Sequence, residues 1–207
     1  MDNTFDSVRE AKRVFDMEIT ALARTRDALD KSFGEITGLL LRCQGKVILT
    51  GIGKPGHIAA KIASSLSSLG TPAIYLHPAE AAHGDLGMVT DQDVVVLASY
   101  SGESREITGL LPGLEAIGCE TVAITGDGDS TLARGCRYQF VFPPFEEACH
   151  LHLAPTASTA ALLALGDALA VAVSGARNYT EEDFRRNHPA GMLGLRFRGA
   201  ADSSEQM

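Results

Sequence analysis

The sequence predicts an α/β fold, a three-layer α-β-α sandwich around a doubly wound, five-stranded parallel sheet. Short apolar runs rich in β-branched residues alternate along the chain with helical patterns, which is typical of βαβ units. These runs are continuously apolar, as in strands that are buried on both faces. The chain has 207 residues, of which 45% are hydrophobic and 21% charged, and this suits a single ordered domain over residues 1–207.

The first 42 residues predict an N-terminal helical segment. Apolar side chains recur there at spacings of three and four, as on one face of a long amphipathic helix. They are Val8, Ala11, Val14, Phe15, Ile19, Leu22, Ala23 and Leu29. We expect any break in this helix to fall near Gly34. At the other end of the chain, residues 196–207 predict a flexible tail.

Five apolar runs predict the strands, and the segments between them predict crossover helices. The strand runs cover residues 46–51, 72–77, 93–99, 120–126 and 138–142. Helical patterns follow at residues 55–70, 104–118 and 129–135, and most end at glycine. Residues 156–176 are apolar nearly all round, which predicts a helix buried in the core or in a subunit interface. Thr180 is expected to cap a last short helix that ends before Pro189.

Two loops stand out as a ligand site. In a flavodoxin-like strand order the loops after the first and third strands are neighbours at the switch point, where such sheets bind ligands. The third-strand loop reads SYSGES: Ser99, Ser101 and Ser104 offer hydroxyls, and Gly102 allows a close approach of the backbone. A strand-to-helix turn of this kind suits a phosphate group. An ordinary helix cap with incidental serines is the alternative for an isolated turn.

The first-strand loop reads GIGKPGH. Gly51, Gly53 and Gly56 have the spacing of a dinucleotide fingerprint, but the acid that would bind a ribose after the next strand is missing. We therefore expect no nucleotide cofactor. Lys54 is either a solvated surface lysine or the cation that offsets a bound phosphate.

Several histidines and acids follow other predicted strands. His77, Glu80, His83 and Asp85 fall within nine residues, but their spacing is not a recognised metal pattern, and a hydrogen-bonded polar loop is the simpler explanation. The same applies to the group Cys149, His150 and His152. We expect no metal site, and metal binding by the first of these groups is the minor alternative. Glu147 and His188 are candidates for acid–base chemistry only in company with other site residues.

Composition narrows the classes of partner. The formal net charge of −8 argues against a surface that binds nucleic acid. The N-terminus has no apolar signal region, and we expect no run of about 18 apolar residues that could span a membrane. Four cysteines without C-x-x-C spacing favour reduced thiols. We therefore expect a cytoplasmic protein with neither nucleic-acid nor membrane partners.

The motifs taken together resemble the sugar isomerase (SIS) domain of arabinose-5-phosphate isomerases. The segments HPAEAAHGDLGM, SYSGESREI, LAPTAST and HPAGMLG occur in the family's order and spacing between about residues 46 and 195. The resemblance implies the SIS fold, a homotetramer with sites built partly across subunits, and no cofactor. It also implies interconversion of D-ribulose 5-phosphate and D-arabinose 5-phosphate, a step toward the lipopolysaccharide sugar Kdo. Paired CBS domains often follow this domain in the family, whereas the present chain stops about a dozen residues after HPAGMLG. We therefore expect a stand-alone isomerase domain.

The resemblance also implies roles for individual residues. The family's catalytic lysine, glutamates and histidine fall on Lys54, Glu103, Glu147 and His188. Its substrate contacts are expected at Gly53, His83, Ser99, Ser101, Gly102, Ser104 and Thr156. The chain departs from the family's usual pattern at Pro55, Tyr100 and Ala190, which could alter the fit of the substrate.

The expected mechanism is proton transfer through an enediol. Such an isomerisation needs a base next to a carbonyl and a group that returns the proton, and we expect Glu147 and His188 to share these steps. Glu103 is expected to point across the crevice toward Lys54 or the sugar hydroxyls. One alternative is an isomerase acting on a hexulose or sedoheptulose phosphate. The other is a sugar-phosphate sensor without catalysis, which would need the serines but not the acids or the histidine.

Overall fold

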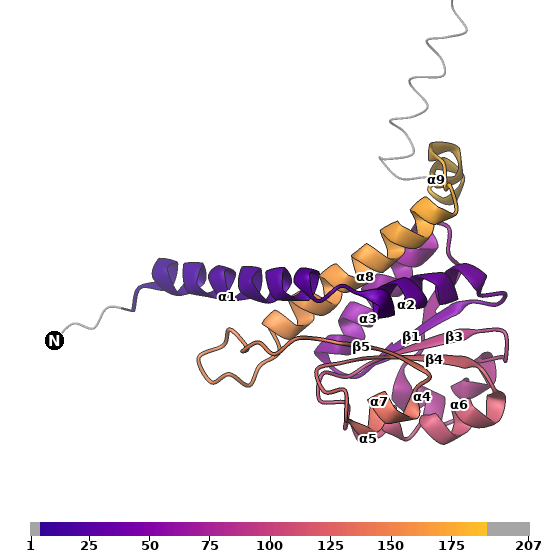
Figure 1. The fold of residues 1–207 in the computed structure, drawn as a ribbon, viewed down its shortest axis with the longest axis horizontal. Helices are drawn as coiled ribbons and strands as arrows, with labels where there is room; N and C mark the ends of the chain where they lie inside the picture. The colour runs from indigo at the N-terminus through magenta and orange to yellow at the C-terminus, as the bar shows by residue number, and fades with distance from the viewer. Residues whose placement is uncertain (1–4, 190–207) are drawn as a thin grey trace, which may run out of the picture.

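A parallel sheet of five strands forms the middle layer of the structure (Figure 1). The computed structural model describes residues 5–189. The strands are β1 (Val47–Gly51), β2 (Ala73–Tyr75), β3 (Val94–Ala98), β4 (Glu120–Thr125) and β5 (Tyr138–Val141). Their order is β2-β1-β3-β4-β5, and every neighbouring pair is parallel. The predicted fold class and the flavodoxin-like strand order are confirmed.

The register of β1 and β3 places the two ligand loops side by side. Gly51, the last residue of β1, is paired with Ala98, the last residue of β3. The two strands therefore end at the same level, and the segments that follow them, Ile52–Gly53 and Ser99–Ser104, leave the sheet as neighbours. This confirms the arrangement predicted for the switch point.

One face of the sheet is covered by α2 (Lys31–Arg42), α3 (Lys54–Ser68) and α8 (Ala157–Ala176). Alternate strand residues such as Leu49 and Val96 point to this side. They form a core with Leu40 of α2, Ile62 of α3 and Leu165 of α8, all nearly inaccessible to solvent.

The other face is covered by short helices. They are α4 (Pro78–Ala82), the 3₁₀ helix η1 (Asp85–Met88), α5 (Arg105–Thr108), α6 (Leu111–Ile117) and α7 (Thr131–Gly135). Ile48 and Leu97 point to this side of the sheet and pack against Ile107 and Leu114. The two separate cores, one on each face, give the predicted three layers.

Three expectations about individual elements are wrong. The N-terminal helix is broken at Ala28–Asp30, before α2, and not at Gly34, which lies inside α2. Asp30 causes this break, because its side chain accepts the Ser32 N–H at 2.8 Å and so starts a new helix. The crossover predicted at residues 104–118 is divided into α5 and α6. Strand β2 is only half-buried because it lies at the sheet edge.

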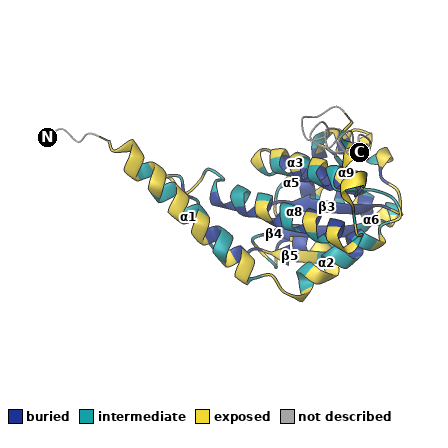
Figure 2. Cartoon of the chain, turned by 90° about the horizontal axis from the view of Figure 1, so that it is seen from above, coloured by how far each residue is buried: buried dark blue, intermediate teal, exposed yellow. Residues whose placement is uncertain are grey.

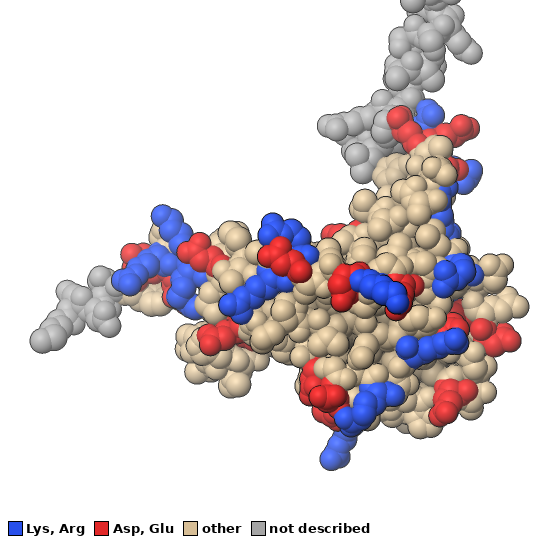
Figure 3. All heavy atoms as spheres, viewed as in Figure 1, with Lys and Arg blue, Asp and Glu red and all other residues tan. Residues whose placement is uncertain are grey.

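Helix α1 (Ser7–Asp27) projects beyond the sheet and packs on α8 through its C-terminal half (Figures 1 and 2). Along its length only Ala21 and Thr25 are fully buried. Phe15 and Ile19, on the predicted apolar face, are 68% and 58% exposed. Lysines and arginines alternate with acids over the face of the molecule drawn in Figure 3.

Helix α8 is apolar on nearly every side, as predicted. Among the helices of residues 5–189 it alone has the length and composition that could cross a membrane, so the expectation that no such run exists is wrong. A core helix of a soluble protein passes the same test. Here α8 packs against α1, α2 and α3, and its Leu165 and Val173 are buried, while Val171 is exposed.

The last described helix is α9 (Glu181–Asn187), and it begins at the predicted cap. The Thr180 hydroxyl and the Asp183 carboxylate form a reciprocal capping box at its start. The predictions for Ala190 and for the tail at residues 196–207 lie outside the described residues.

Candidate functional site

The turn after β3 gathers the predicted serines. Ser99 is buried, with 4% of its surface exposed, and its hydroxyl lies 3.0 Å from that of Ser104, the cap of α5. The exposed Ser101 accepts the Glu103 N–H at 3.3 Å, and the Gly102 N–H donates to the Ser99 carbonyl at 3.0 Å. The turn is thus a compact set of hydroxyls and backbone groups at a helix start, which can hold an anion.

Gly102 is required at its position by conformation and by space. Its φ of +66° lies in the left-handed region, and an added Cβ would stand 2.1 Å from the Ser130 hydroxyl and 3.0 Å from that of Thr125. Gly102 therefore packs directly against Ser130, the cap of α7. The Gly102 carbonyl also accepts the Leu132 N–H at 3.0 Å.

Lys54 stands at the neighbouring loop. It is the first residue of α3, it is exposed, and Gly53 precedes it with a φ of +63°. The base of the loop is held by the Tyr75 hydroxyl, which donates to the Gly51 carbonyl at 2.8 Å. Because β1 and β3 end at the same level, Lys54 can balance an anion bound at the serine turn.

Glu147 is held at the start of α8. Its Oε2 accepts the Thr156 N–H at 2.7 Å, the Thr156 hydroxyl at 3.0 Å and the Ser158 N–H at 3.3 Å. The Thr156 hydroxyl in turn accepts the Ala148 N–H at 2.8 Å. Thr156 is therefore a positioning residue for the acid, and Arg13 of α1 fixes the same loop by donating to the Ala148 carbonyl.

Glu103 does not point across the crevice toward Lys54, so that expectation is wrong. Its Oε1 accepts the Thr131 N–H at 2.7 Å, and its Oε2 accepts the Thr131 hydroxyl at 2.9 Å. These bonds hold the pKa of the Glu103 carboxyl below its usual range. The reason is local: α7 begins beside the turn, and its unpaired N–H groups are the nearest donors.

His188 is held by the end of α3 and by its own helix. Its Nδ1 lies 2.8 Å from the Phe184 carbonyl oxygen, and its Nε2 lies 2.9 Å from the Ser68 hydroxyl. A carbonyl oxygen only accepts, so this geometry requires the proton on Nδ1 and leaves Nε2 as the atom that can take a proton. The Phe184 ring stacks on the imidazole with centroids 3.9 Å apart.

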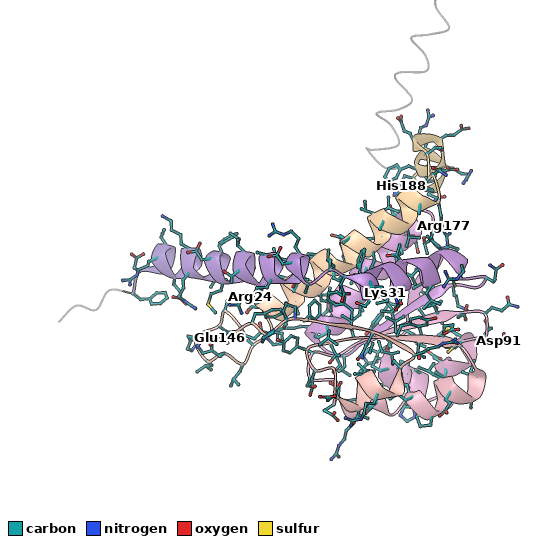
Figure 4. All side chains as sticks on the ribbon, viewed as in Figure 1. Arg24, Lys31, Asp91, Glu146, Arg177 and His188 are labelled. Carbon is teal, nitrogen blue, oxygen red and sulfur yellow. The ribbon has the colours of Figure 1, made fainter. Side chains whose placement is uncertain are left out.

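A single chain does not bring His188 to the rest of the site. Ser68, its partner, is the last residue of α3, whereas Lys54 is the first. The 15 residues of α3 span about 21 Å at about 1.5 Å per residue. In Figure 4 His188 and Glu146, the neighbour of Glu147, lie near opposite ends of α8. Within one chain, His188 and Lys54 therefore lie at opposite ends of α3.

The polar loop after β2 contains the cap and the end of α4. His77 caps α4 by accepting the Ala79 N–H at 3.3 Å, and the exposed His83 ends the same helix. Within residues 5–189, no three His, Cys, Asp or Glu side chains stand together as metal ligands would.

Sequence reasoning missed the partners that hold the site residues. Thr131 binds Glu103 and Ser68 binds His188. The DSTLARG segment, in which Ser130 caps α7 directly before Thr131, could have indicated Thr131. No pattern in the sequence points to Ser68.

The fold defines an open parallel α/β protein, and the serine turn is a candidate ligand site at its switch point. The sequence profile of the SIS domain matches residues 40–172, and the chain belongs to this family. It is 47% identical over 180 residues to arabinose 5-phosphate isomerase GutQ of Salmonella typhi, covering 87% of this chain and 56% of that protein. It is 46% identical over 190 residues to arabinose 5-phosphate isomerase KdsD of Escherichia coli K12, and this match covers 92% of this chain and 58% of that protein. The chain thus spans somewhat more than half the length of these curated relatives.

A solved structure is also similar over nearly the whole chain. It is that of c3406 from Escherichia coli CFT073 in complex with arabinose 5-phosphate, with a TM-score of 0.87 and 40% sequence identity. The match covers 91% of this chain and 100% of that chain.

Proposed function

We propose that this chain is an aldose–ketose isomerase that interconverts D-ribulose 5-phosphate and D-arabinose 5-phosphate. The names of the curated relatives and the ligand of the similar structure support this substrate. The observation that carries the proposal is structural: the serine turn and Lys54 lie at adjacent strand ends, and the firmly held Glu147 lies at the start of α8, the helix over the same face of the sheet.

The serine turn binds the phosphate in this proposal. Ser99, Ser101 and Ser104 supply hydroxyls, Gly102 gives the turn its positive φ and its close packing on α7, and Lys54 balances the negative charge. The phosphate does not react, so its binding energy serves to orient the reacting carbons. Glu103 supports the turn by joining it to α7.

Glu147 and His188 transfer the protons. One removes a proton from the carbon beside the carbonyl, an enediol forms, and the other helps return a proton to the adjacent carbon. Positioned groups of this kind each contribute about 10²–10⁴-fold. Thr156 holds Glu147 in place, while Gly53 and His83 contact the sugar.

Each active site is shared between copies of the chain. The separation of about 21 Å along α3 supports a His188 from a neighbouring subunit. We propose a homotetramer of single SIS domains, located in the cytoplasm. Its product would enter synthesis of the lipopolysaccharide sugar Kdo.

Product identification tests the function. Purified protein is incubated with D-ribulose 5-phosphate without NAD(P), and sugar phosphates are identified by NMR. The proposal predicts arabinose 5-phosphate. Preferred turnover of a hexulose or sedoheptulose phosphate would favour the other isomerases, and binding of all of them without turnover would favour a sensor.

A further inference from the structure

Tyr100 connects the two halves of the proposed site. It lies between Ser99 and Ser101 in the serine turn. Its side chain lines a small cavity together with Ser99 and with Ser158 of α8. The Ser158 N–H is one of the donors that hold Glu147. Tyr100 therefore lies between the phosphate turn and the helix end that holds the acid.

The ring of Tyr100 is fixed on several sides. It stacks on Phe142, with centroids 6.4 Å apart, and it packs against Phe145 at 5.5 Å. It also lies against Gly126, where an added Cβ would come within 2.8 Å of a ring atom. Its carbonyl accepts the Gly126 N–H at 2.8 Å and the Thr125 hydroxyl at 3.2 Å. The ring cannot move without displacing the end of β4, so it is a rigid spacer.

The phenol of Tyr100 is partly buried. Burial and, next, the negative charge of Glu147 raise the pKa of the Tyr100 phenol above its usual range. The phenol therefore keeps its proton at neutral pH and can donate a hydrogen bond.

We propose that Tyr100 determines the carbon-chain length of the sugar phosphate. This inference rests on the proposed function, in which the turn binds the phosphate and Glu147 acts at the reacting carbons. The rigid ring fixes the span between these two groups. In a five-carbon 2-ketose 5-phosphate, two carbons separate the carbonyl from the carbon that bears the phosphate. A six-carbon 2-ketose 6-phosphate adds one more, and a fixed pocket discriminates one extra carbon by about 10–200-fold.

The experiment compares kcat/KM for D-ribulose 5-phosphate and D-fructose 6-phosphate. We expect the wild type and Tyr100→Phe to prefer the five-carbon sugar by about tenfold or more. Tyr100→Ala should reduce this preference about tenfold. The ratio of two substrates on one preparation does not depend on the fraction of folded protein. Tyr138→Ala removes a ring at the start of β5, at the other end of the sheet, and should leave the ratio unchanged.

A binding series separates this inference from the proposed function. Calorimetry measures the affinity of each variant for inorganic phosphate and for aldonate phosphates of five and six carbons. Tyr100→Ala should bind inorganic phosphate as the wild type does and lose its preference between the two aldonates. A wild type that turns over neither sugar would refute the proposed function, and the aldonates would still test Tyr100. A preference that survives in Tyr100→Ala overturns the inference.

Discussion

At the scale of single residues, the site depends on groups that other parts of the chain hold in place. Glu147 has three donors from the start of α8, and Glu103 has two from Thr131. The sequence predicted that the loops after β1 and β3 are neighbours at the carboxyl ends of the strands, since the ends of the strands follow from the apolar runs. It did not predict where Glu103 points, because that depends on α7, which lies nearly 30 residues further along the chain.

Gly102→Ala should destabilise the protein. A non-glycine residue at positive φ costs about 1–3 kcal/mol, and the clash with Ser130 adds to this. Urea denaturation should show the free energy of unfolding reduced by at least that amount, together with weaker phosphate binding. Gly34→Ala is the control: it lies in open space inside α2, and it should stabilise by about 0.5–1 kcal/mol. Equal stability of Gly102→Ala and the wild type would contradict the account of the turn.

Glu103→Gln should change the dependence of stability on pH. The folded protein lowers the pKa of this carboxyl, so the charged form stabilises the fold above the ordinary value of 4.5, and this contribution disappears as pH falls through the lowered value. Thermal melts should show a higher Tm for the wild type at pH 7 and a difference that closes below pH 4.5. Glu115→Gln, on the exposed side of α6, controls for the loss of one charge. A difference in Tm that persists unchanged in acid would refute the bonds to Thr131.

At the scale of elements, caps decide where the helices begin. Asp30 starts α2 and the Thr180–Asp183 box starts α9. The α9 cap was predicted because Thr180 stands before acids and after a long apolar run. The α2 cap was not predicted, because the apolar periodicity continues across Asp30 and Gly34 was the more obvious helix breaker. A glycine inside a helix costs only about 1 kcal/mol of stability relative to alanine, so α2 tolerates Gly34.

Helix α1 has an apolar face that the single chain leaves exposed, with Phe15 68% exposed. If the proposed tetramer covers this face, Phe15→Asp would place a charge in the interface, and we expect it to yield smaller species. Light scattering after size-exclusion chromatography measures the mass. Lys12→Asp alters the charge at an exposed position of the same helix and should leave the mass unchanged. An intact tetramer of Phe15→Asp would show that this face lies outside the interface.

At the scale of the whole molecule, one chain holds Glu147 and His188, the two groups proposed to transfer protons, near opposite ends of α8 (Figure 4). The parallel strand order explains why the loop before Lys54 and the serine turn leave the sheet as neighbours, and this order could be predicted from the sequence. The separation between His188 and Lys54 could not be predicted from the sequence, because it depends on how α9 packs on the end of α3 through Ser68. In the proposed function, the incomplete site of the single chain makes a second copy of the chain part of each active site.

Complementation between two inactive variants tests this shared site most directly. Glu147→Gln and His188→Ala are each purified, then unfolded and refolded together in equal amounts, and isomerisation of ribulose 5-phosphate is assayed. Random assembly should give both native groups to about a quarter of the sites, so about a quarter of wild-type activity should return. A mixture no more active than either variant alone, beside a fully active wild type treated in the same way, would contradict the account.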